Sequence, residues 1–558
     1  MIVGMSNDWG PAMAVHLVGG GIAALAAAAL AIRDARVPGP EIHIYEAEPE
    51  LGGALRIAGD ADEGYVYPGG RMFEAGYRCT LDLLAGIPLP DDRTRSVADD
   101  IRLFNRYNVW NDRARLVGRH GRVLPYRLGL GPDDMAALMR VAASPEAALS
   151  GRSIGDCVPA GLFNSGFWHA FASMMAFRPD HSALELRRYL RRFLHLLPDL
   201  WSMRGVQRTR HNQHEAIVAP LVGWLRRHGV QLHSEVRVEE LDFAQRGALL
   251  YVAGLRLSEA NGAARWISTT PHDRVFVTLG SQVADLSVGS MTEAPLRLGE
   301  QESRGWILWR QIVAARHYGV GRPNVFARRD PAATWVSFTV TDTGSPLPHR
   351  LEALTGQVAG LNGLITLRDS PWRLTLTRFH QPNVAGQPQG TFLWWGYGLR
   401  TEALGNRVRK PMTECTGSEV LQETLHQLGV GALSEDVLRQ SICRPCLMPH
   451  AGSVLLNRRI GDRPPVVPLR FRNLAFIGQF AEQPDETAFT MEYSVRTAWT
   501  AVHRLLHTRR PPPPVALGIQ QPWKLFRPWD SELGCVLRPA SPSQGRRSWS
   551  YQKPGNVR

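Results

Sequence analysis

The sequence predicts an α/β fold of several subdomains, organised around a dinucleotide-binding βαβ unit close to its start. An apolar strand, Val15–Val18, runs into three consecutive glycines at 19–21 and then into an alanine-rich helix. A second apolar strand, Ile42–Tyr45, follows and ends at the acidic residue Glu46. The chain has 558 residues. That length exceeds what one hydrophobic core usually serves, so we expect about two to four subdomains.

The spacing of small residues in this unit indicates a bound dinucleotide. Gly19 permits a tight turn, Gly21 lets the backbone approach a pyrophosphate, and Ala24 allows the helix to pack closely on the strand. The pyrophosphate would lie at the helix N-terminus, where free N–H groups favour an anion. Glu46 can accept hydrogen bonds from a ribose diol. The alternative is a plain glycine turn before a buried helix. The predicted cofactor contacts in this unit are Gly19, Gly20, Gly21, Ile22, Ala23, Ala24 and Glu46.

A second glycine pair favours FAD over NAD as the cofactor. This pair, 52–53, follows the ribose-binding acid and resembles the continued motif of two-dinucleotide-binding flavoproteins. A short strand at 275–279 ends in another glycine, and a strand at 474–477 meets a glycine before a helix at about 489–505. A second helix N-terminus would therefore reach the flavin. The further predicted cofactor contacts are Gly52, Gly53, Gly70, Arg71, Met72, Val238, Gly280, Ser281, Gly478 and Thr490.

The rest of the chain predicts a discontinuous organisation. Helices are expected at 133–143, 183–197 and 215–227, and strands at 231–241, 335–340, 372–379 and 391–397. The strand at 231–241 could rejoin the nucleotide sheet. We therefore divide the chain into FAD-binding parts at 14–80, 201–290 and 466–508, a helical insertion at 81–200, a β-rich substrate domain at 291–465, and a partly disordered C-terminal tail at 509–558.

Composition limits the classes of partner and the site chemistry. The formal net charge is +13, which favours an acidic partner such as a nucleic acid, an anionic membrane or a carboxylate substrate, or is only a solvated arginine-rich surface. Six cysteines form no disulfide framework and no zinc spacing, so we predict no metal. Cys443 and Cys446 form a single C-x-x-C without a βαβ unit around it. Free, reduced cysteines are the default expectation in a cytosolic protein.

Membrane and secretion signals are not expected from the pattern. The apolar run 12–32 lacks a basic segment before it and is used by the nucleotide motif, so it does not read as a signal peptide. No other stretch approaches the roughly 20 apolar residues of a membrane span. We predict a cytoplasmic protein. The basic balance and the tail aromatics Trp523, Phe526 and Trp529 leave open a peripheral association with an anionic inner membrane face.

Several longer segments carry a specific resemblance to a known family. The segments are GGGIAALAAA, YPGGRMFEAGY, LFNRYN, HNQHE, VFVTLGS, SFTVT, FHQP, WGYGL, KPMTECTG and FIGQFAEQPDETAFTMEYSVR. They recur in order from about residue 15 to 505, and with them the chain resembles the oleate hydratase family, the fatty-acid double-bond hydratases once called myosin-cross-reactive antigens. The resemblance implies an FAD-dependent hydro-lyase that adds water to an isolated cis double bond of a free unsaturated fatty acid, and no nucleic acid as partner.

Two departures from the family pattern fall in the predicted catalytic loops. The family carries a water-activating glutamate in a G-G-R-E-M-type loop, and Met72 stands at that position here. Glu74 is two residues on and would point away in a helical continuation. A tyrosine credited with proton donation in a Y-N-Q-Y-E-type segment is His211 here, and His214 takes the second tyrosine position. Because imidazolium is more acidic than phenol by about 3.5 pKa units, His211 could donate the proton.

These departures leave three interpretations of the loops open. The water site could be relaxed and held by backbone groups, the flavin and Asn212, or the activity could have changed. Met72 could simply pack under the flavin, Glu74 could favour a helix dipole, and the histidines could be polar residues bonded to backbone. Arg71 is expected to contact the flavin or its phosphates. The candidate catalytic residues are His211, Met72, Asn212, Glu74 and His214.

The resemblance also implies a head-group site and a weak oligomer. The segment at 448–453 aligns with the family segment that contacts the fatty-acid carboxylate, so His450, Ser453 and the downstream Arg458 are the candidates. Family members commonly carry a helical extension before the first strand that contributes to dimer contacts. Only a short segment precedes Val15 here, which predicts a monomer or a weak dimer.

Two other functional classes stay open at this stage. A flavin oxidoreductase acting on a lipid or an amine would share the nucleotide module, and a non-catalytic flavoprotein that binds fatty acids or membranes is consistent with the missing glutamate. Hydration itself is redox-neutral. The sequence leaves open whether the flavin must be reduced for full activity.

Overall fold

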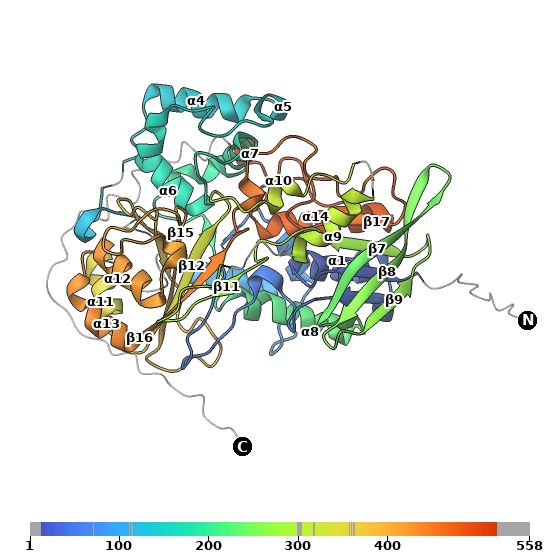
Figure 1. Cartoon of the computed structure of the whole chain (residues 1–558), viewed down its shortest axis with the longest axis horizontal. Coiled ribbons are helices and arrows are strands. Elements are labelled where there is room, and N and C mark those ends of the chain that lie inside the picture. The colour runs from blue at the N-terminus through green and yellow to red at the C-terminus, as the bar shows by residue number, and fades with distance from the viewer. Residues whose placement is uncertain are drawn as a thin grey trace, which may run out of the picture.

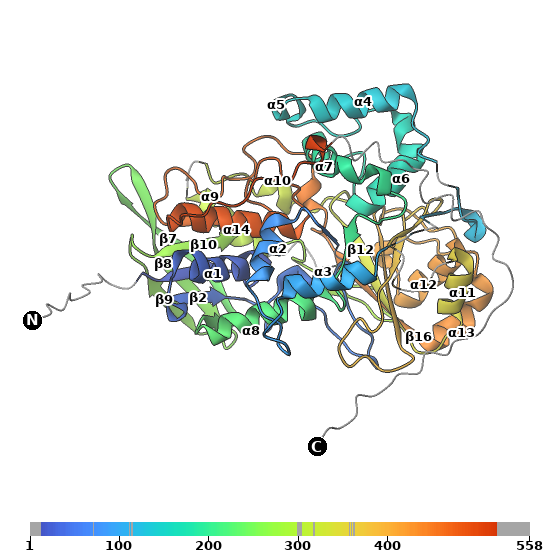
Figure 2. The same cartoon turned by 180° about the vertical axis from the view of Figure 1, so that it is seen from behind.

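The computed structural model describes residues 13–521 except 71, 111, 113–114, 126, 298–303, 316–318, 357, 359 and 361–362. Two halves lie side by side (Figure 1). One half carries the helices α1 (Ile22–Ala35) and α14 (Met491–Leu505), and the other is built on the strands β12 (Trp335–Asp342) and β16 (Ser441–Met448). The helix α4 (Pro132–Ala143) lies at the outer edge of the molecule (Figures 1 and 2).

A five-stranded parallel sheet forms the centre of the nucleotide half. Its order is β17-β10-β1-β2-β6, and every neighbouring pair is parallel. Strands with both faces covered read as continuous apolar runs, and β1 and β17 are buried at every residue. The α/β flavoprotein-type fold predicted from the sequence is therefore confirmed. The strand bounds are β1 (Val15–Val18), β2 (Ile42–Tyr45), β6 (Gln231–His233), β10 (Arg274–Thr278) and β17 (Leu474–Ile477).

Helices and a small second sheet complete this half. The helix α1 packs along α14, and its run of buried alanines lets the two axes approach closely. α1 also contacts α2 (Arg78–Ala85) and α8 (Ala219–Arg227). A three-stranded antiparallel sheet extends outward and contacts β2 and the helix α9 (Arg304–Ala314). Its strands are β7 (Val236–Arg246), β8 (Leu249–Glu259) and β9 (Ala264–Ser268).

The β-rich half is a seven-stranded, mostly antiparallel sheet. Its order is β11-β16-β12-β15-β14-β13-β4, and only the β4–β13 pair is parallel. The helices α11 (Leu347–Thr355), α12 (Gly417–Gln427) and α13 (Ser434–Gln440) share a separate apolar core with this sheet. The remaining strands are β4 (Leu116–Val117), β11 (Ser287–Val288), β13 (Ile365–Leu367), β14 (Thr375–Arg378) and β15 (Phe392–Gly398), and α10 (Asn324–Ala327) is a short connector.

The helical insertion is tied to the nucleotide half by buried ion pairs. Its helices are α3 (Val97–Tyr107), α4, α5 (Glu146–Leu149), α6 (Gly166–Met175) and α7 (Ala183–Phe193). Arg188 of α7 pairs with Glu146 and Glu482, and Arg192 pairs with Glu486. Part of the arginine excess of this chain is thus buried and neutralised, rather than spread on the surface.

Several predicted elements differ from the structure in detail. The expected strand at 231–241 is two strands, because Glu235 adopts a left-handed φ of 57° and the chain leaves the nucleotide sheet there. The expected helix at 215–227 begins with a π-turn at His214–Val218 before α8. The strand at 372–379 shortens to β14 because Arg373 has a φ of 56°. A two-stranded ribbon, β3 (Phe73–Glu74) with β5 (Val206–Gln207), was not foreseen. The domain boundaries stay a prediction, and the tail beyond 521 lies outside the described residues.

Candidate active site

A large cavity lies at the ends of the parallel strands and the N-terminus of α1. Its volume is about 620 Å³. Ligands of α/β sheets bind outside the carboxyl ends of the strands, so this cavity occupies the expected place for a dinucleotide. The predicted cofactor residues that line it are Gly19, Gly20, Gly21, Ile22, Ala23, Glu46, Gly52, Gly53, Val238, Gly280 and Ser281.

Each of the three glycines in the first turn has a different structural reason to lack a side chain. Gly19 has a φ of +96°, which L side chains rarely adopt. A side chain on Gly20 would meet the Glu46 carboxylate, which accepts a hydrogen bond of 2.7 Å from the Gly20 N–H. A Cβ on Gly21 would meet no atom within 4 Å, so that position faces open cavity at the start of α1. The residues present therefore fit a dinucleotide whose phosphates approach the backbone closely.

The other predicted cofactor residues lie elsewhere. Ala24 is buried in the core, and the Thr490 hydroxyl caps α14 by accepting the Tyr493 N–H. Gly478 packs toward Thr278 and does not line the cavity, although Met491, at the start of α14, does. The structure therefore brings the second helix N-terminus to the cavity through Met491. Gly70 and Met72 line a neighbouring cavity, and Arg71 lies outside the described residues.

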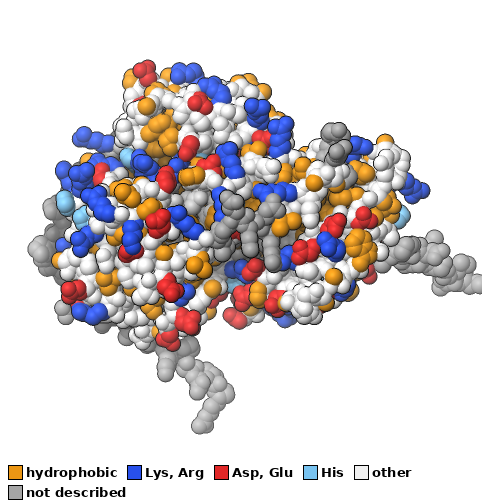
Figure 3. Space-filling model, viewed as in Figure 1, with side chains coloured by type: hydrophobic (Ala, Val, Ile, Leu, Met, Phe, Trp, Pro, Cys, Tyr) orange, Lys and Arg blue, Asp and Glu red, His pale blue; other side chains and the backbone are white. Residues whose placement is uncertain are grey.

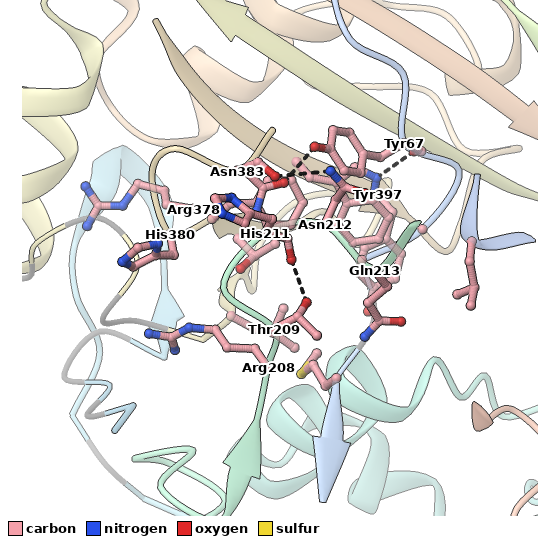
Figure 4. Close-up of a pocket in the computed structure, with 18 of the residues that line it drawn as sticks. Tyr67, Arg208, Thr209, His211, Asn212, Gln213, Arg378, His380, Asn383 and Tyr397 are labelled. Atoms are coloured by element: carbon pink, nitrogen blue, oxygen red, sulfur yellow. Dashed lines mark hydrogen bonds between the residues drawn. The ribbon is translucent and has the colours of Figure 1, made fainter. Parts of the chain in front are cut away.

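That neighbouring cavity is smaller and more enclosed by side chains. Its volume is about 100 Å³, and Leu55 and Arg56 line both cavities, so the two adjoin. Segments far apart in sequence meet in it. Its apolar wall is formed by Leu55, Met72, Trp110, Met174, Ala176, Trp335, Leu364, Phe379, Trp395 and Phe489, and its polar lining includes Tyr67, Arg208, Thr209, His211, Asn212, Gln213, Thr377, Arg378, His380, Asn383 and Tyr397 (Figure 4).

The loop with the missing glutamate contributes apolar packing to this cavity. Met72 packs against a small cluster formed by Trp110, Met203 and Leu364. Glu74 is on a short strand rather than at a helix start, and it lines neither cavity. It accepts a hydrogen bond of 3.0 Å from His195 and lies 3.1 Å from Arg192. Burial alone would raise the pKa of Glu74, but His195 and Arg192 outweigh burial and lower it. Glu74 is thus an ionised structural group, not a replacement for the missing acid.

His211 and Asn212 are placed in the cavity wall by a hydrogen-bond network. His211 Nδ1 lies 3.0 Å from the Pro382 carbonyl oxygen, and the Thr209 hydroxyl donates to the His211 carbonyl at 2.6 Å. Both ends of the Asn212 side-chain amide make hydrogen bonds. It donates to the Asn383 carbonyl at 3.2 Å and accepts the Glu215 N–H at 3.0 Å.

The two histidines of this segment therefore differ in placement. His211 lines the smaller cavity, whereas His214 lines neither cavity and packs beside Gly52, where a Cβ would lie 3.2 Å from its ring. The structure brings together His211, Asn212 and Met72 and leaves His214 and Glu74 outside.

Gln213 is a polar group that the sequence interpretation passed over. It is buried and lines the smaller cavity, and neither its amide oxygen nor its amide nitrogen has a hydrogen-bond partner among the described residues. In Figure 4 it lies on the opposite side of the cavity from Arg378 and His380. A buried amide with both ends unpaired costs stability. Such a group is therefore available to a water molecule or a substrate atom.

A buried arginine is the second unexpected feature of this cavity. Arg208 lies over the Trp110 ring at 4.8 Å from its centroid, and its Nε and one terminal nitrogen have no hydrogen-bond partner among the described residues. Burial lowers the pKa of Arg208. Burial also raises the pKa of the nearby Asp112 to about 7, although the positive charge of Arg115 partly offsets this rise. The sequence does not indicate that Arg208 is buried, because it is one of many arginines in a basic chain.

The residues predicted to hold a substrate carboxylate do not reach either of these cavities. Arg458 is fully buried and pairs with Glu185 at 2.8 Å and with Glu482 at 3.0 Å. His450 lies 3.4 Å from Asp285, and the Ser453 hydroxyl lies 3.5 Å from His450. Arg458 already has two carboxylate partners, so this interpretation is corrected: its charge serves the fold. Cys443 and Cys446 are also structural, since both are buried in β16 and burial raises the pKa of Cys446 to about 12.

Comparison with known proteins now decides the family. The sequence profile of the MCRA family matches residues 12–503. The chain belongs to the MCRA family. It is 33% identical to the oleate hydratase of Streptococcus pyogenes serotype M49 (strain NZ131), over 89% of this chain and 85% of that protein. It is also 29% identical to the linoleate hydratase of Lactiplantibacillus plantarum, over 87% of this chain and 92% of that protein.

Solved structures agree on the fold. The cyclohexylamine oxidase of Brevibacterium oxydans IH-35A superposes with a TM-score of 0.53 and 12% sequence identity, over 89% of this chain and 99% of that chain. At this identity the likeness concerns the fold alone. The chain is thus a member of the MCRA family with a fold similar to that of this oxidase.

The surface offers no single dominant charged patch on the face drawn in Figure 3. Lys and Arg side chains there are spread among acidic ones. Within the described part of the chain, no helix combines the length and the apolar character that crossing a membrane requires.

Proposed function

We propose that this chain is an FAD-dependent fatty acid hydratase that adds water to a cis double bond of a free unsaturated fatty acid, as in the conversion of oleate to 10-hydroxystearate. The observation that carries the proposal is a cavity with an apolar wall and with His211 and Gln213 in its polar lining, which adjoins a dinucleotide-sized cavity in a member of the MCRA family. An unactivated alkene needs a positioned acid, a held water and a dry surrounding.

His211 is the proposed proton donor. With the Nδ1 hydrogen donated to the Pro382 carbonyl, the ring presents Nε2 as the atom that carries and releases the proton. An imidazolium is a stronger acid than the phenol of a tyrosine by about 3.5 pKa units on reference values. A histidine at this position can therefore protonate an alkene carbon.

Gln213 is the proposed anchor of the attacking water. Asn212 already makes hydrogen bonds with Asn383 and Glu215 through its amide. Among the residues that the structure describes, none bonds to the Gln213 amide, so its oxygen can accept from water and its nitrogen can donate. It orients water for attack on a carbon that already carries cationic character, and the proton that this water loses after attack returns to the neutral His211 imidazole, so that the acid is regenerated.

Arg208 is the proposed partner of the substrate carboxylate. It is a buried cation that lines the smaller cavity and keeps unpaired donors among the described residues. Arg378 and His380 line the same cavity. A carboxylate would supply the charge-assisted hydrogen bonds that a buried guanidinium otherwise lacks.

FAD is the proposed cofactor, held by the glycines at 19–21, Glu46 and the strand ends around Gly280. When bound, it would supply structure and an electrostatic environment, because adding water to an alkene leaves no net electrons to transfer. Whether the cofactor must be in its reduced form for full activity can be read from activity titrated against dithionite.

The test is to incubate the FAD-loaded protein with oleate in ¹⁸O-water and to identify the products by mass spectrometry. The proposal predicts one labelled oxygen in a hydroxy fatty acid. An oxo or further desaturated product would instead indicate a flavin oxidoreductase. Unchanged oleate, with the fatty acid bound, would indicate a non-catalytic binding protein.

A further inference from the structure

A third cavity lies on the side of the β-rich half that faces α6. Its volume is about 290 Å³, larger than that of the proposed catalytic cavity, and the two cavities share no lining residue. Trp168 and Ala172 of α6 form one apolar wall with Phe177, and Leu399 lies across from them. None of the roles proposed above uses this cavity.

The charges around this cavity are unevenly paired. Its two carboxylates, Asp180 and Glu402, both pair with Arg178, at 3.2 Å and 3.0 Å. Arg373 and Arg400 also line it, and among the described residues neither has a carboxylate within ion-pair distance. The two guanidinium groups are close enough that Arg400 lowers the pKa of Arg373, after burial as the larger cause. Within the described part of the chain, the cavity therefore has two cations without a carboxylate counter-ion.

Arg373 is held toward the cavity by its surroundings. One terminal nitrogen lies 2.8 Å from His169 Nδ1, so the ring accepts this hydrogen bond and stays neutral. Burial, followed by the charge of Arg373, lowers the pKa of His169 to about 4. Arg373 also adopts a φ of 56°, a left-handed conformation that favours glycine or asparagine and costs about 1–2 kcal/mol in other residues. The backbone conformation at position 373 would thus favour glycine or asparagine over the arginine that is present.

We propose that this cavity is a second binding site, for a monocarboxylate with a short apolar tail, separate from the catalytic cavity. The carboxylate lies between Arg373 and Arg400, and the tail lies against Trp168, Phe177 and Leu399. Octanoate has a carboxylate and a short apolar tail, and it has no double bond to hydrate.

The test is calorimetric titration of the FAD-loaded full chain with octanoate. An Arg208→Leu background should weaken binding in the catalytic cavity, which rests on the head-group role proposed for Arg208. Binding that persists in this background and falls with Arg373→Gln or Arg400→Gln reports the third cavity. In that background Arg400→Gln and Arg373→Gln should each weaken octanoate binding by at least about tenfold, the loss of one charge-assisted hydrogen bond. Arg400 is exposed, so its variant folds regardless of the Arg373–His169 contact. Arg368→Gln is the matched control, because Arg368 pairs with Asp369 and does not line the cavity.

Three outcomes would overturn the proposal. They are no octanoate binding in the Arg208→Leu background, binding unchanged in both the Arg373 and the Arg400 variants, or equal displacement of octanoate by inorganic phosphate, which lacks a tail. A crystal soaked with a bromine-tipped octanoate gives a second readout, with bromine expected beside Trp168. Bromine in the catalytic cavity alone would contradict the second site. None of these results depends on whether the protein hydrates oleate, so failure here and failure of the hydratase proposal are distinguishable.

Discussion

The two adjoining cavities differ in the kind of residue that lines them. The larger one is lined by glycine turns and strand ends, and at Gly21 the backbone faces open cavity. The smaller one is walled by large side chains from the 67–72 loop, the 208–213 segment and the strands β14 and β15. A backbone cradle suits a cofactor that many enzymes share, whereas side chains decide which reaction occurs beside it. Changes in the smaller cavity should therefore alter chemistry, and changes in the larger one should alter cofactor occupancy.

The largest effect is expected at the proposed proton donor. His211→Gln should lower kcat by roughly a hundred- to ten-thousandfold, the usual range for a general acid, while FAD binding stays unchanged. His214→Gln is the matched control, since His214 lines neither cavity. Steady-state kinetics with oleate checks both. Equal losses in the two variants would remove His211 from the mechanism.

A cofactor-specific loss is expected at Gly21. Gly21→Ala places a methyl group in open cavity, so the apo fold should be unaffected while FAD affinity falls by on the order of a hundredfold, because the group occupies the space of the pyrophosphate. Gly161→Ala is the control, because a Cβ there also meets no atom within 4 Å but lies away from both cavities. Flavin fluorescence titration measures both. Unchanged affinity in Gly21→Ala would contradict this placement of the phosphates.

A smaller effect is expected at the proposed head-group cation. Arg208→Leu should raise KM for oleate by about tenfold or more and leave KM for its methyl ester nearly unchanged, because only the acid carries the charge that Arg208 would pair. Arg210→Gln, an exposed arginine two residues on, serves as control. If acid and ester respond alike, Arg208 acts through packing on Trp110 instead.

The smallest effect concerns stability and pH. Burial raises the pKa of Asp112 to about 7 in the folded chain, so between about pH 4 and 7 the folded state binds more protons than the unfolded state. The free energy of unfolding should therefore fall as pH rises through this window, by on the order of 1–3 kcal/mol from this group. Asp112→Asn should flatten that slope in urea titrations at several pH values. A slope unchanged by the substitution would show that Asp112 is ionised throughout.

The same division between cavities explains what sequence reasoning could reach. The nucleotide half follows from local patterns: β1, β2 and β17 have the predicted bounds, and the glycine turn lines the expected cavity. His211 and Met72 were also within reach, because they stand in segments with a recognisable pattern. Arg208 and Gln213 were not, since burial and the absence of partners arise from elements far apart in the chain.

Arg458 is the opposite case, a residue that the sequence indicates as a substrate contact and that the structure places in the protein core. It was assigned to a substrate carboxylate from its neighbourhood in sequence. Its partners Glu185 and Glu482 come from distant segments, and only the fold reveals that they satisfy its charge. Similarly, the left-handed turn at Arg373 shortens a predicted strand and aims a cation at a cavity that no local pattern indicates.

The central claim is that the larger cavity holds a flavin while the smaller cavity performs a reaction that transfers no net electrons. The most direct measurement follows flavin absorbance and product together during anaerobic turnover of oleate. We predict that hydroxy fatty acid accumulates far beyond one molecule per bound flavin, with no progressive change in flavin absorbance and no consumption of NAD(P)H. Product that stops at one per flavin, or that forms only as the flavin changes redox state, would contradict the account.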